Sequence, residues 1–369
     1  MPLRHVLLFS FGTVLAFAAA PAQAQNTHHQ TLAFGDRSLG MGGAFTGLAT
    51  DQGAAWYNPA GLAFLERDSV SGSLLLHAFE YLRYDGGDLD LETTRRPTFP
   101  LFATGVVGVG QRGESHGRHQ HAVGIVVVRP LQLRRRFEAE AETALGEPAQ
   151  LLIDRVHHQT WFGPSWASQL TPRFSIGASL LATVNTFEHR EVLIGTTAVA
   201  GAAVRSALTE VKSNHLMLRF GGLYAGDRFR FGFLLQPPGA PLREKGIYTD
   251  LRALPGRPPV FSSAENADAS FPLPAIGRFG ASYVLGGQGQ YVISGDLQVV
   301  LPTPSTRLID LPAPAEASRS EAAAGSFVDL DTGRNGVVNG AIGFEWRAGR
   351  DFLIRVGAYT DLSTARALP

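Results

Sequence analysis

The glycines between residues 108 and 113 have the spacing of a dinucleotide-binding loop, which makes them the first candidates for chemistry in this chain. Such a loop presents a pyrophosphate to the N-terminus of the helix that follows it. Residues 114–119 read instead as a polar turn, so no helix is expected there. We interpret the glycines as the end of a strand that enters a tight turn, and we predict no nucleotide site.

Two further patterns could bind a metal ion, and both are incomplete. His119 and His121 share one face of a strand, and with His116 they form the densest histidine cluster, but Glu114 is the only carboxylate nearby. Residues 329–336 begin like a calcium loop, yet they lack the later oxygen ligands and the final glutamate. We interpret these segments as solvated turns, and we predict no metal and no cofactor.

The composition argues against catalysis and against nucleic-acid binding. A barrel hydrolase needs a serine or aspartate beside a histidine, but no Gly-x-Ser-x-Gly motif accompanies the 11 histidines. The 32 basic and 32 acidic side chains balance, so no basic surface is indicated. Because there is no cysteine, disulfide and thiolate chemistry are excluded. We therefore predict a protein that is not an enzyme.

The most distinctive stretch of the chain is rich in glycine and alanine and covers residues 38–63. Small side chains allow backbones to pack closely. Asp51 can cap a short helix over residues 52–56, and Asn58 followed by Pro59 combines a cap with proline at the first helical position. We interpret the stretch as a compact bundle of short helical turns inside the lumen of a barrel.

After Asp68 the chain is a succession of segments whose polarity alternates, as in strands. The clearest covers residues 173–185, where only Leu181 interrupts the polar face. Its length fits the roughly nine to eleven residues of a strand that crosses a bilayer. Aromatic residues on one face and charged residues on the other suit a barrel with a polar lumen. About twelve strands are expected, over residues 69–83, 100–111, 119–129, 151–168, 172–187, 205–225, 227–236, 244–252, 275–286, 290–301, 334–348 and 351–360, with long loops over 130–150, 188–204, 237–274 and 302–333.

Residues 1–24 have the organisation of a secretory signal peptide. Arg4 precedes an apolar run over 6–20, and the small residues at 22–24 form a cleavage site that would leave Gln25 at the mature N-terminus. The apolar run is shorter than the roughly 20 residues of a membrane-spanning helix. The mature protein is therefore expected to be periplasmic, secreted or a membrane barrel.

Residues 37–46 and 54–62 together resemble the amino-terminal hatch of the FadL/TodX family of outer-membrane transport proteins. The resemblance implies a transmembrane antiparallel β-barrel of about fourteen strands in the bacterial outer membrane, with a helical hatch in its lumen. It also implies passive uptake of hydrophobic compounds, such as long-chain fatty acids or hydrocarbons. The residues that it assigns to the hatch and its gating are Asn58, Pro59, Ala60, Gly40, Gly42 and Gly43.

The predicted organisation is a signal peptide over 1–24, a hatch over 25–66 and a barrel over 67–369. Residues 365–369 do not end an amphipathic strand in an aromatic residue, so we favour a chain that lacks the last hairpin over a barrel with fewer strands. Expected partners are hydrophobic small molecules, outer-membrane lipid and lipopolysaccharide, with no nucleic acid and a monomeric state. The alternative function is a non-transporting barrel that acts as a docking or shuttle partner in protein secretion.

Overall fold

The computed structural model describes most of the chain from Ala33 onward. The predicted signal peptide, His116 and the start of the calcium-like segment at 329–331 lie outside the described residues. The described residues are 33–74, 80–86, 89–95, 101–112, 119–142, 148–197, 201–253, 256, 258–286, 290–310, 332–348, 352–362 and 364.

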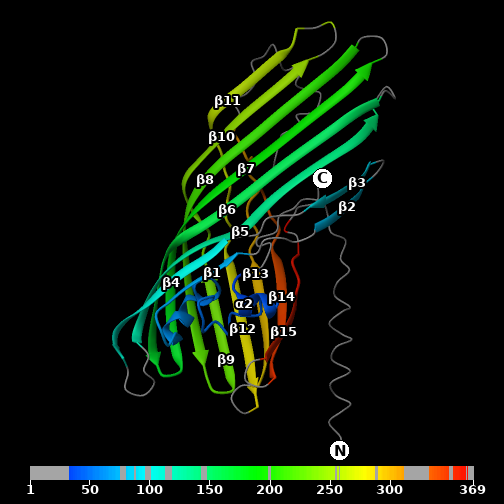
Figure 1. Cartoon of the computed structure of the whole chain (residues 1–369). Helices are drawn as coiled ribbons and strands as arrows, with labels where there is room; N and C mark the ends of the chain where they lie inside the picture. Colours follow the sequence, from blue (N-terminus) through cyan, green and yellow to red (C-terminus); the bar gives the residue numbers. More distant parts are fainter. Residues whose placement is uncertain are drawn as a thin grey trace, which may run out of the picture.

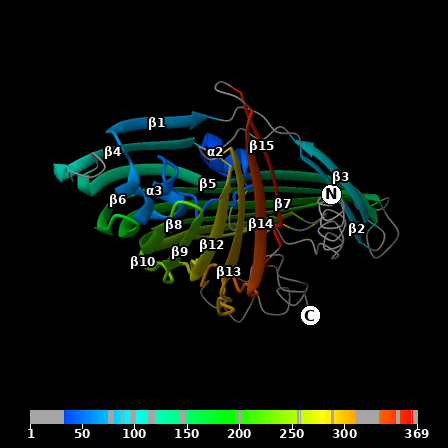
Figure 2. The ribbon, with the colours of Figure 1, turned by 90° about the horizontal axis from the view of Figure 1, so that it is seen from below.

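The strands of the described residues form one large antiparallel sheet that curves into a barrel around the amino-terminal helices (Figures 1 and 2). The sheet has 13 strands, and its main path runs β1-β4-β5-β6-β7-β8-β9-β12-β13-β14-β15. The hairpin of β2 and β3 is separate. The strands are β1 Ser69–Leu74, β2 Glu80–Gly86, β3 Leu89–Arg95, β4 Leu101–Arg112, β5 His119–Glu142, β6 Pro148–Thr171, β7 Phe174–Thr197, β8 Gly201–Ala225, β9 Phe229–Gln236, β10 Ala240–Ala253, β11 Val260–Asp268, β12 Ile276–Leu285, β13 Tyr291–Val300, β14 Val337–Ala348 and β15 Phe352–Tyr359.

β5 and β7 are much longer than the predicted strands over 119–129 and 172–187, whereas β6 and β8 extend the predicted strands over 151–168 and 205–225 by a few residues at their ends. β5, β6 and β7 have 24 residues each and β8 has 25, so the predicted loops over 130–150 and 188–204 are wrong. The predicted strand over 244–252 lies within β10, which pairs with β8, but the predicted loop over 237–274 around it is wrong, because β10 begins at Ala240 and β11 follows it. The charge of residues 130–150 and the prolines of residues 237–274 favour loops in the sequence, but strand pairing holds much of both segments in the sheet. In Figure 1 these strands rise well above the ends of β12 to β15.

The two faces of the wall differ in polarity, as the alternation predicted. On β7, Leu180 and Val184 point outward and are 42% and 45% exposed, whereas Ser175 and Thr183 point into the lumen and are buried. Leu181, which interrupts the polar face in the sequence, is fully buried on the lumen side. An apolar outer face with a polar inner face is typical of barrels that sit in a lipid bilayer.

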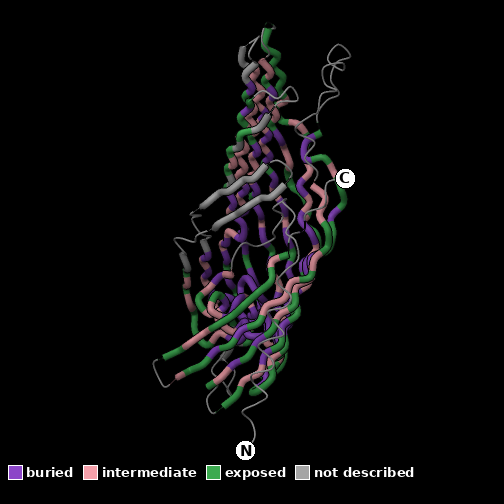
Figure 3. The backbone as a smooth tube through the Cα atoms, turned by 90° about the vertical axis from the view of Figure 1, so that its right-hand side faces the viewer, coloured by how far each residue is buried: buried purple, intermediate pink, exposed green. Residues whose placement is uncertain are grey.

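The hatch consists of three short helices, α2 Asp36–Gly40, α3 Ala54–Tyr57 and the 3₁₀-helix η2 Pro59–Phe64. They lie between the walls in the lower half of the barrel, where the buried backbone is concentrated (Figure 3). The predicted cap at Asn58 is confirmed, because its side chain accepts a hydrogen bond from the Ala60 amide at the start of η2. Asp51 does not cap a helix over 52–56; it accepts a bond from the Gly53 amide in the turn before α3.

No helix among the described residues is long and apolar enough to span a membrane.

Candidate gating site at the hatch

Asn58 is the polar centre of the contact between the hatch and the wall. Its side chain is fully buried, and its Nδ2 donates to the carbonyl oxygens of Thr46, at 3.1 Å, and Gly222 on β8, at 3.0 Å. Its Oδ1 accepts from the Ala60 amide at 3.2 Å. One side chain therefore closes the turn before η2, ties two parts of the hatch together and fixes both to the wall.

The two residues after Asn58 extend this contact to the neighbouring strand. Pro59 and Ala60 are both buried, and the hydroxyl of Ser175 on β7 donates to the Ala60 carbonyl oxygen at 2.7 Å. The three residues predicted as the hatch element thus lie together against β7 and β8.

Three pairs of facing glycines line the wall where the hatch rests on it. Gly177 pairs with Gly221, Gly232 with Gly280, and Gly343 with Gly357. A Cβ at Gly177 would lie 2.5 Å from the Ala60 amide nitrogen, and one at Gly221 would collide with the Asn58 side chain. A Cβ at any of the other four would collide with hatch backbone in the same way. Because these positions carry no side chain, the hatch backbone packs directly on the wall backbone.

The predicted hatch glycines lie on the opposite side of the hatch from Asn58. A Cβ at Gly40 would lie 2.8 Å from the Cβ of Arg355, and one at Gly42 would lie 2.6 Å from the Ala358 amide nitrogen. Gly42 and Gly43 have φ angles of +62° and +81°, a backbone conformation that favours glycine. Gly40 and Gly42 therefore pack closely against β15, whereas a Cβ at Gly43 would meet only the Cβ of Ala33, at 4.0 Å.

Carboxylates of the wall hold this side of the hatch, and the sequence did not reveal them. Asp296 on β13 accepts from the amides of Phe45 and Thr46 at 3.0 and 2.8 Å. Glu345 on β14 forms a two-point ion pair with Arg37 of α2, at 2.9 and 3.0 Å. The Arg355 guanidinium donates to the same carboxylate at 2.8 Å. The strand alternation places Asp296 and Glu345 on the lumen side, but only the fold shows what they bind.

A small cavity of about 80 Å³ separates this part of the hatch from the upper ends of β12 to β15. Gly42, Gly43 and Tyr57 line it from the hatch, and Arg278 and Asp296 line it from the wall. The cavity shows that the hatch does not fill the lumen completely. Other lining residues are Ala33, Gln298, Asn339, Gly340, Ala341, Tyr359, Thr360 and Asp361.

A second segment folds into the upper lumen, and we call residues 269–274 together with 303–310 the strap. Its two parts pair through an isolated bridge between Ala269 and Ile309. Phe271 and Leu308 of the strap are buried in the same apolar cluster as Trp56 of the hatch. The strap therefore narrows the lumen above the hatch.

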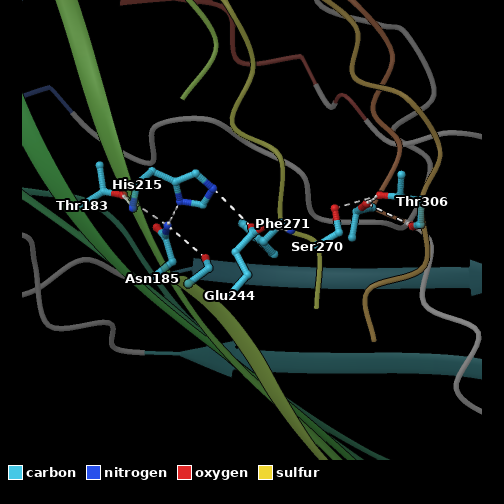
Figure 4. Close-up of polar contacts among 9 residues, drawn as sticks. Thr183, Asn185, His215, Glu244, Ser270, Phe271 and Thr306 are labelled. Carbon is cyan, nitrogen blue, oxygen red and sulfur yellow. Dashed lines mark hydrogen bonds and ion pairs between the residues drawn. The ribbon is translucent and has the colours of Figure 1, made fainter. Parts of the chain in front are cut away.

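Polar contacts attach the strap to the wall (Figure 4). The Phe271 amide donates to Oε1 of Glu244 on β10 at 2.8 Å, and His215 Nε2 on β8 lies 3.3 Å from the same oxygen. His215 is held in turn by Asn185 on β7, whose Nδ2 lies 3.4 Å from His215 Nδ1. Within the strap, Ser270 and Thr306 are joined through their hydroxyl groups at 3.3 Å.

The lumen-facing residues of β8 contact the hatch and the strap in order. Gly221 accommodates Asn58, and Arg219 stacks on Trp56. The next lumen-facing residue of β8 is Met217. It lies beside the strap, because a Cβ built at Gly239 would contact both the Met217 side chain and Leu273 of the strap. His215 then contacts Glu244, which binds the strap. β8 thus links the two narrow parts of the lumen.

His121 of the predicted histidine cluster lies beside an aromatic ring of the neighbouring strand. His121 on β5 stacks on Trp166, with ring centroids 6.2 Å apart. Within the part of the chain that the structure describes, no three histidine, aspartate or glutamate side chains are placed to share a metal ion.

These features define an antiparallel β-barrel whose lumen holds an amino-terminal hatch. Among solved structures with this fold, the P. putida toluene transporter TodX aligns with 88% of this chain and 82% of its own, at 12% identity and a TM-score of 0.59. The CymD monoaromatic hydrocarbon channel aligns over 90% and 84%, at 16% identity and a TM-score of 0.55. A Pseudomonas aeruginosa FadL homologue aligns over 94% and 82%, at 14% identity and a TM-score of 0.54.

No family model matches the chain, and no curated protein matches its sequence. The structural likeness shows that the chain has the fold of the FadL/TodX-type channels, which confirms the predicted fold class. The predicted domain boundaries and the missing last hairpin stay predictions.

Proposed function

We propose that the protein is an outer-membrane channel for passive uptake of hydrophobic compounds, such as long-chain fatty acids or hydrocarbons, and that the hatch is its gate. The observation that carries this proposal is the way the hatch is held. It rests on a glycine-lined wall and is fixed by polar contacts at Asn58, Asp296 and Glu345. A plug that packs on backbone and is tied at a few points can detach while the barrel stays folded.

The outer surface supports a location within a bilayer. Large apolar side chains are exposed along the lower strands, where a water-soluble barrel would place polar residues. The signal peptide predicted from the sequence would bring the chain to the outer membrane. Examples of these outward residues are Val123, Ile125, Phe220, Phe231, Phe233, Phe279, Ile293, Leu297, Ile342, Phe344 and Val356.

The proposed route begins at the upper lumen, where an apolar solute leaves the polar lipopolysaccharide layer. It passes the strap, continues along β8 and reaches the hatch at Trp56 and Asn58. Displacement of the hatch then opens the way toward the periplasm. Among the proteins with this fold, TodX is described as a toluene transporter and CymD as a monoaromatic hydrocarbon channel, which supports an apolar cargo.

The test is uptake of a labelled long-chain fatty acid by cells that lack their own transporter. Cells that produce this protein should accumulate label above background, and Asn58→Ala should change the rate. Thr50→Ala is the matched control, because within the part of the chain that the structure describes the Thr50 hydroxyl bonds only inside the hatch, to the Leu48 carbonyl oxygen. If a correctly inserted, heat-modifiable barrel gives no uptake, the fatty-acid assignment fails, and other hydrocarbons or a docking role in secretion would replace it.

A further inference from the structure

Three ion pairs on the neighbouring strands β5 to β8 form a charged belt on the outer face of the wall. They join Arg134 with Asp154 at 3.4 Å, Arg190 with Glu188 at 3.6 Å, and Lys212 with Glu210 at 2.8 Å. The register brings the pairs together, because Asp154 lies opposite Arg190 and Glu188 lies opposite Glu210.

The basic member of each pair in the belt is the more exposed one. The side chains of Arg134, Arg190 and Lys212 are 66%, 52% and 68% exposed, whereas those of their acidic partners are 22%, 38% and 26% exposed. The belt therefore presents positive charge to its surroundings, although its basic and acidic side chains are equal in number.

The belt begins directly above the apolar band of the wall. On β7 every outward residue from Phe174 to Val184 is apolar, and Thr186, Glu188 and Arg190 follow on the same face. At about 3.3 Å per residue and a tilt of about 40°, the stretch from Phe174 to Val184 rises about 25 Å, which is the height of the apolar band of an outer-membrane barrel. The charges therefore lie at the level of the lipid head groups.

The belt is at the end of the wall that belongs to the cell exterior. Residues 172–173 and 226–228 form short turns at the other end, as is typical of the periplasmic side of such barrels. The long strands β5 to β8 continue beyond the belt (Figure 1). In the proposed outer-membrane location, the belt thus faces the head groups of the outer leaflet.

A second lysine lies beside the belt on the next strand of the sheet. Lys245 on β10 is directly opposite Lys212, and these two are the only lysines of the chain. Like charges that face each other across an antiparallel pair repel. Glu210 and Asp268 each bind one of the two ammonium groups, at 2.8 and 2.6 Å. An anion that bridges the ammonium groups would remove the remaining repulsion.

We propose that the belt binds lipopolysaccharide, with Arg134, Arg190 and Lys212 as contacts for the phosphate groups of its lipid A head. Phosphate oxygens accept strong hydrogen bonds from arginine and lysine, and basic clusters at a membrane surface are typical of sites for anionic lipids. Lipid A carries its phosphates above its acyl chains, so one molecule can contact the belt and the apolar band together. This inference rests on the outer-membrane location in the proposed function and identifies the lipid that the wall binds there.

The test measures lipid binding to the full-length protein in detergent by native mass spectrometry. The probes are bisphosphorylated lipid A and the same lipid after enzymatic removal of its phosphates. The wild type should bind the phosphorylated form about tenfold more tightly, because three exposed contacts between opposite charges together contribute about that factor. A variant with Arg134→Gln, Arg190→Gln and Lys212→Gln should lose this preference and bind the dephosphorylated lipid as the wild type does.

The matched control removes three positive charges from the opposite end of the wall. Arg173, Arg228 and Arg347 are exposed near the lower turns, and a variant with Arg173→Gln, Arg228→Gln and Arg347→Gln should keep the preference for the phosphorylated lipid. Heat-modifiable electrophoretic mobility checks that each barrel is folded. Equal affinity of the wild type for the two lipids, a belt variant that keeps the preference, or a control that loses it would each overturn the proposal.

Uptake measurements separate this inference from the proposed function. The belt lies outside the lumen, so the belt variant should take up labelled fatty acid as the wild type does, for equal amounts of folded protein. A wild type that transports but does not distinguish the two lipids keeps the channel and rejects the lipopolysaccharide site. A wild type that prefers the phosphorylated lipid but transports nothing keeps the site and rejects the channel.

Discussion

Removal of the Asn58 side chain should release the hatch without unfolding the barrel. In Asn58→Ala the Thr46 and Gly222 carbonyl oxygens and the Ala60 amide each lose their bond to this side chain. Only the Gly222 bond joins the hatch to the wall, and a buried carbonyl oxygen that loses its partner costs about 2 kcal/mol, so the closed hatch loses about 2 kcal/mol relative to the open one. The open population should then rise about 30-fold.

The absence of native cysteine makes this change measurable by thiol labelling. Ala55 in α3 is fully buried, and Ala55→Cys adds a single sulfur atom as the probe. When the hatch recloses faster than the reagent reacts, the labelling rate follows the open population. The rate in Asn58→Ala should therefore be about 30-fold above that of the Asn58 parent. Thr50→Ala should leave the rate unchanged, because the bond that it removes lies inside the hatch and is the same in the closed and open states.

The reasoning is refuted if the probe stays as protected in Asn58→Ala as in its parent while the barrel keeps its heat-modifiable mobility. The bonds of Asn58 would then contribute nothing to closure. A variant that loses the mobility shift would show instead that Asn58 stabilises the whole barrel. The hatch could then not open independently of the wall.

Three other substitutions test the remaining contacts with the same thiol method. Gly280→Ala should expose the Ala55→Cys probe, because the added Cβ would lie 2.5 Å from the Gly47 amide nitrogen. Gly295→Ala is its control, because the Cβ added there would meet only one carbonyl oxygen, at 3.8 Å. Equal labelling of the two variants would contradict the role of the glycine pairs. Glu345→Gln should raise labelling about tenfold, since it weakens the ion pairs to Arg37 and Arg355, and an unchanged rate would show that this tie is dispensable. Glu244→Ala should expose a cysteine placed at Leu308, because the strap loses its bond to the wall, and continued protection of that cysteine would mean that apolar packing alone holds the strap.

The hatch was the part of the site that local sequence described well. The Asn58-Pro59 pair sets a helix start by chemistry confined to a few residues, and the structure has η2 beginning there. The alternation of β7 likewise fixed which side chains face the lumen, because a strand places successive residues on opposite sides.

Strand length was harder to predict, because charge along an exposed strand looks like charge in a loop. Residues 134–136 are three arginines and residues 138–142 alternate glutamate with alanine, yet the whole segment continues β5 above the apolar band. Strand pairing with β6 decides their conformation, and pairing is a long-range property.

The sequence by itself determined the kind of wall and the nature of the plug, because period-two alternation and close-packing glycines act locally. Only the tertiary structure decided what the plug touches. Gly177 and Gly221 become one contact surface through register, and Asp296 meets hatch residues about 250 positions earlier in the chain. Arg219 was an ordinary lumen-facing arginine in the sequence until the fold buried it and stacked it on Trp56 of the hatch. Burial and pairing arise when distant segments meet, so they leave no mark in the spacing of neighbouring residues.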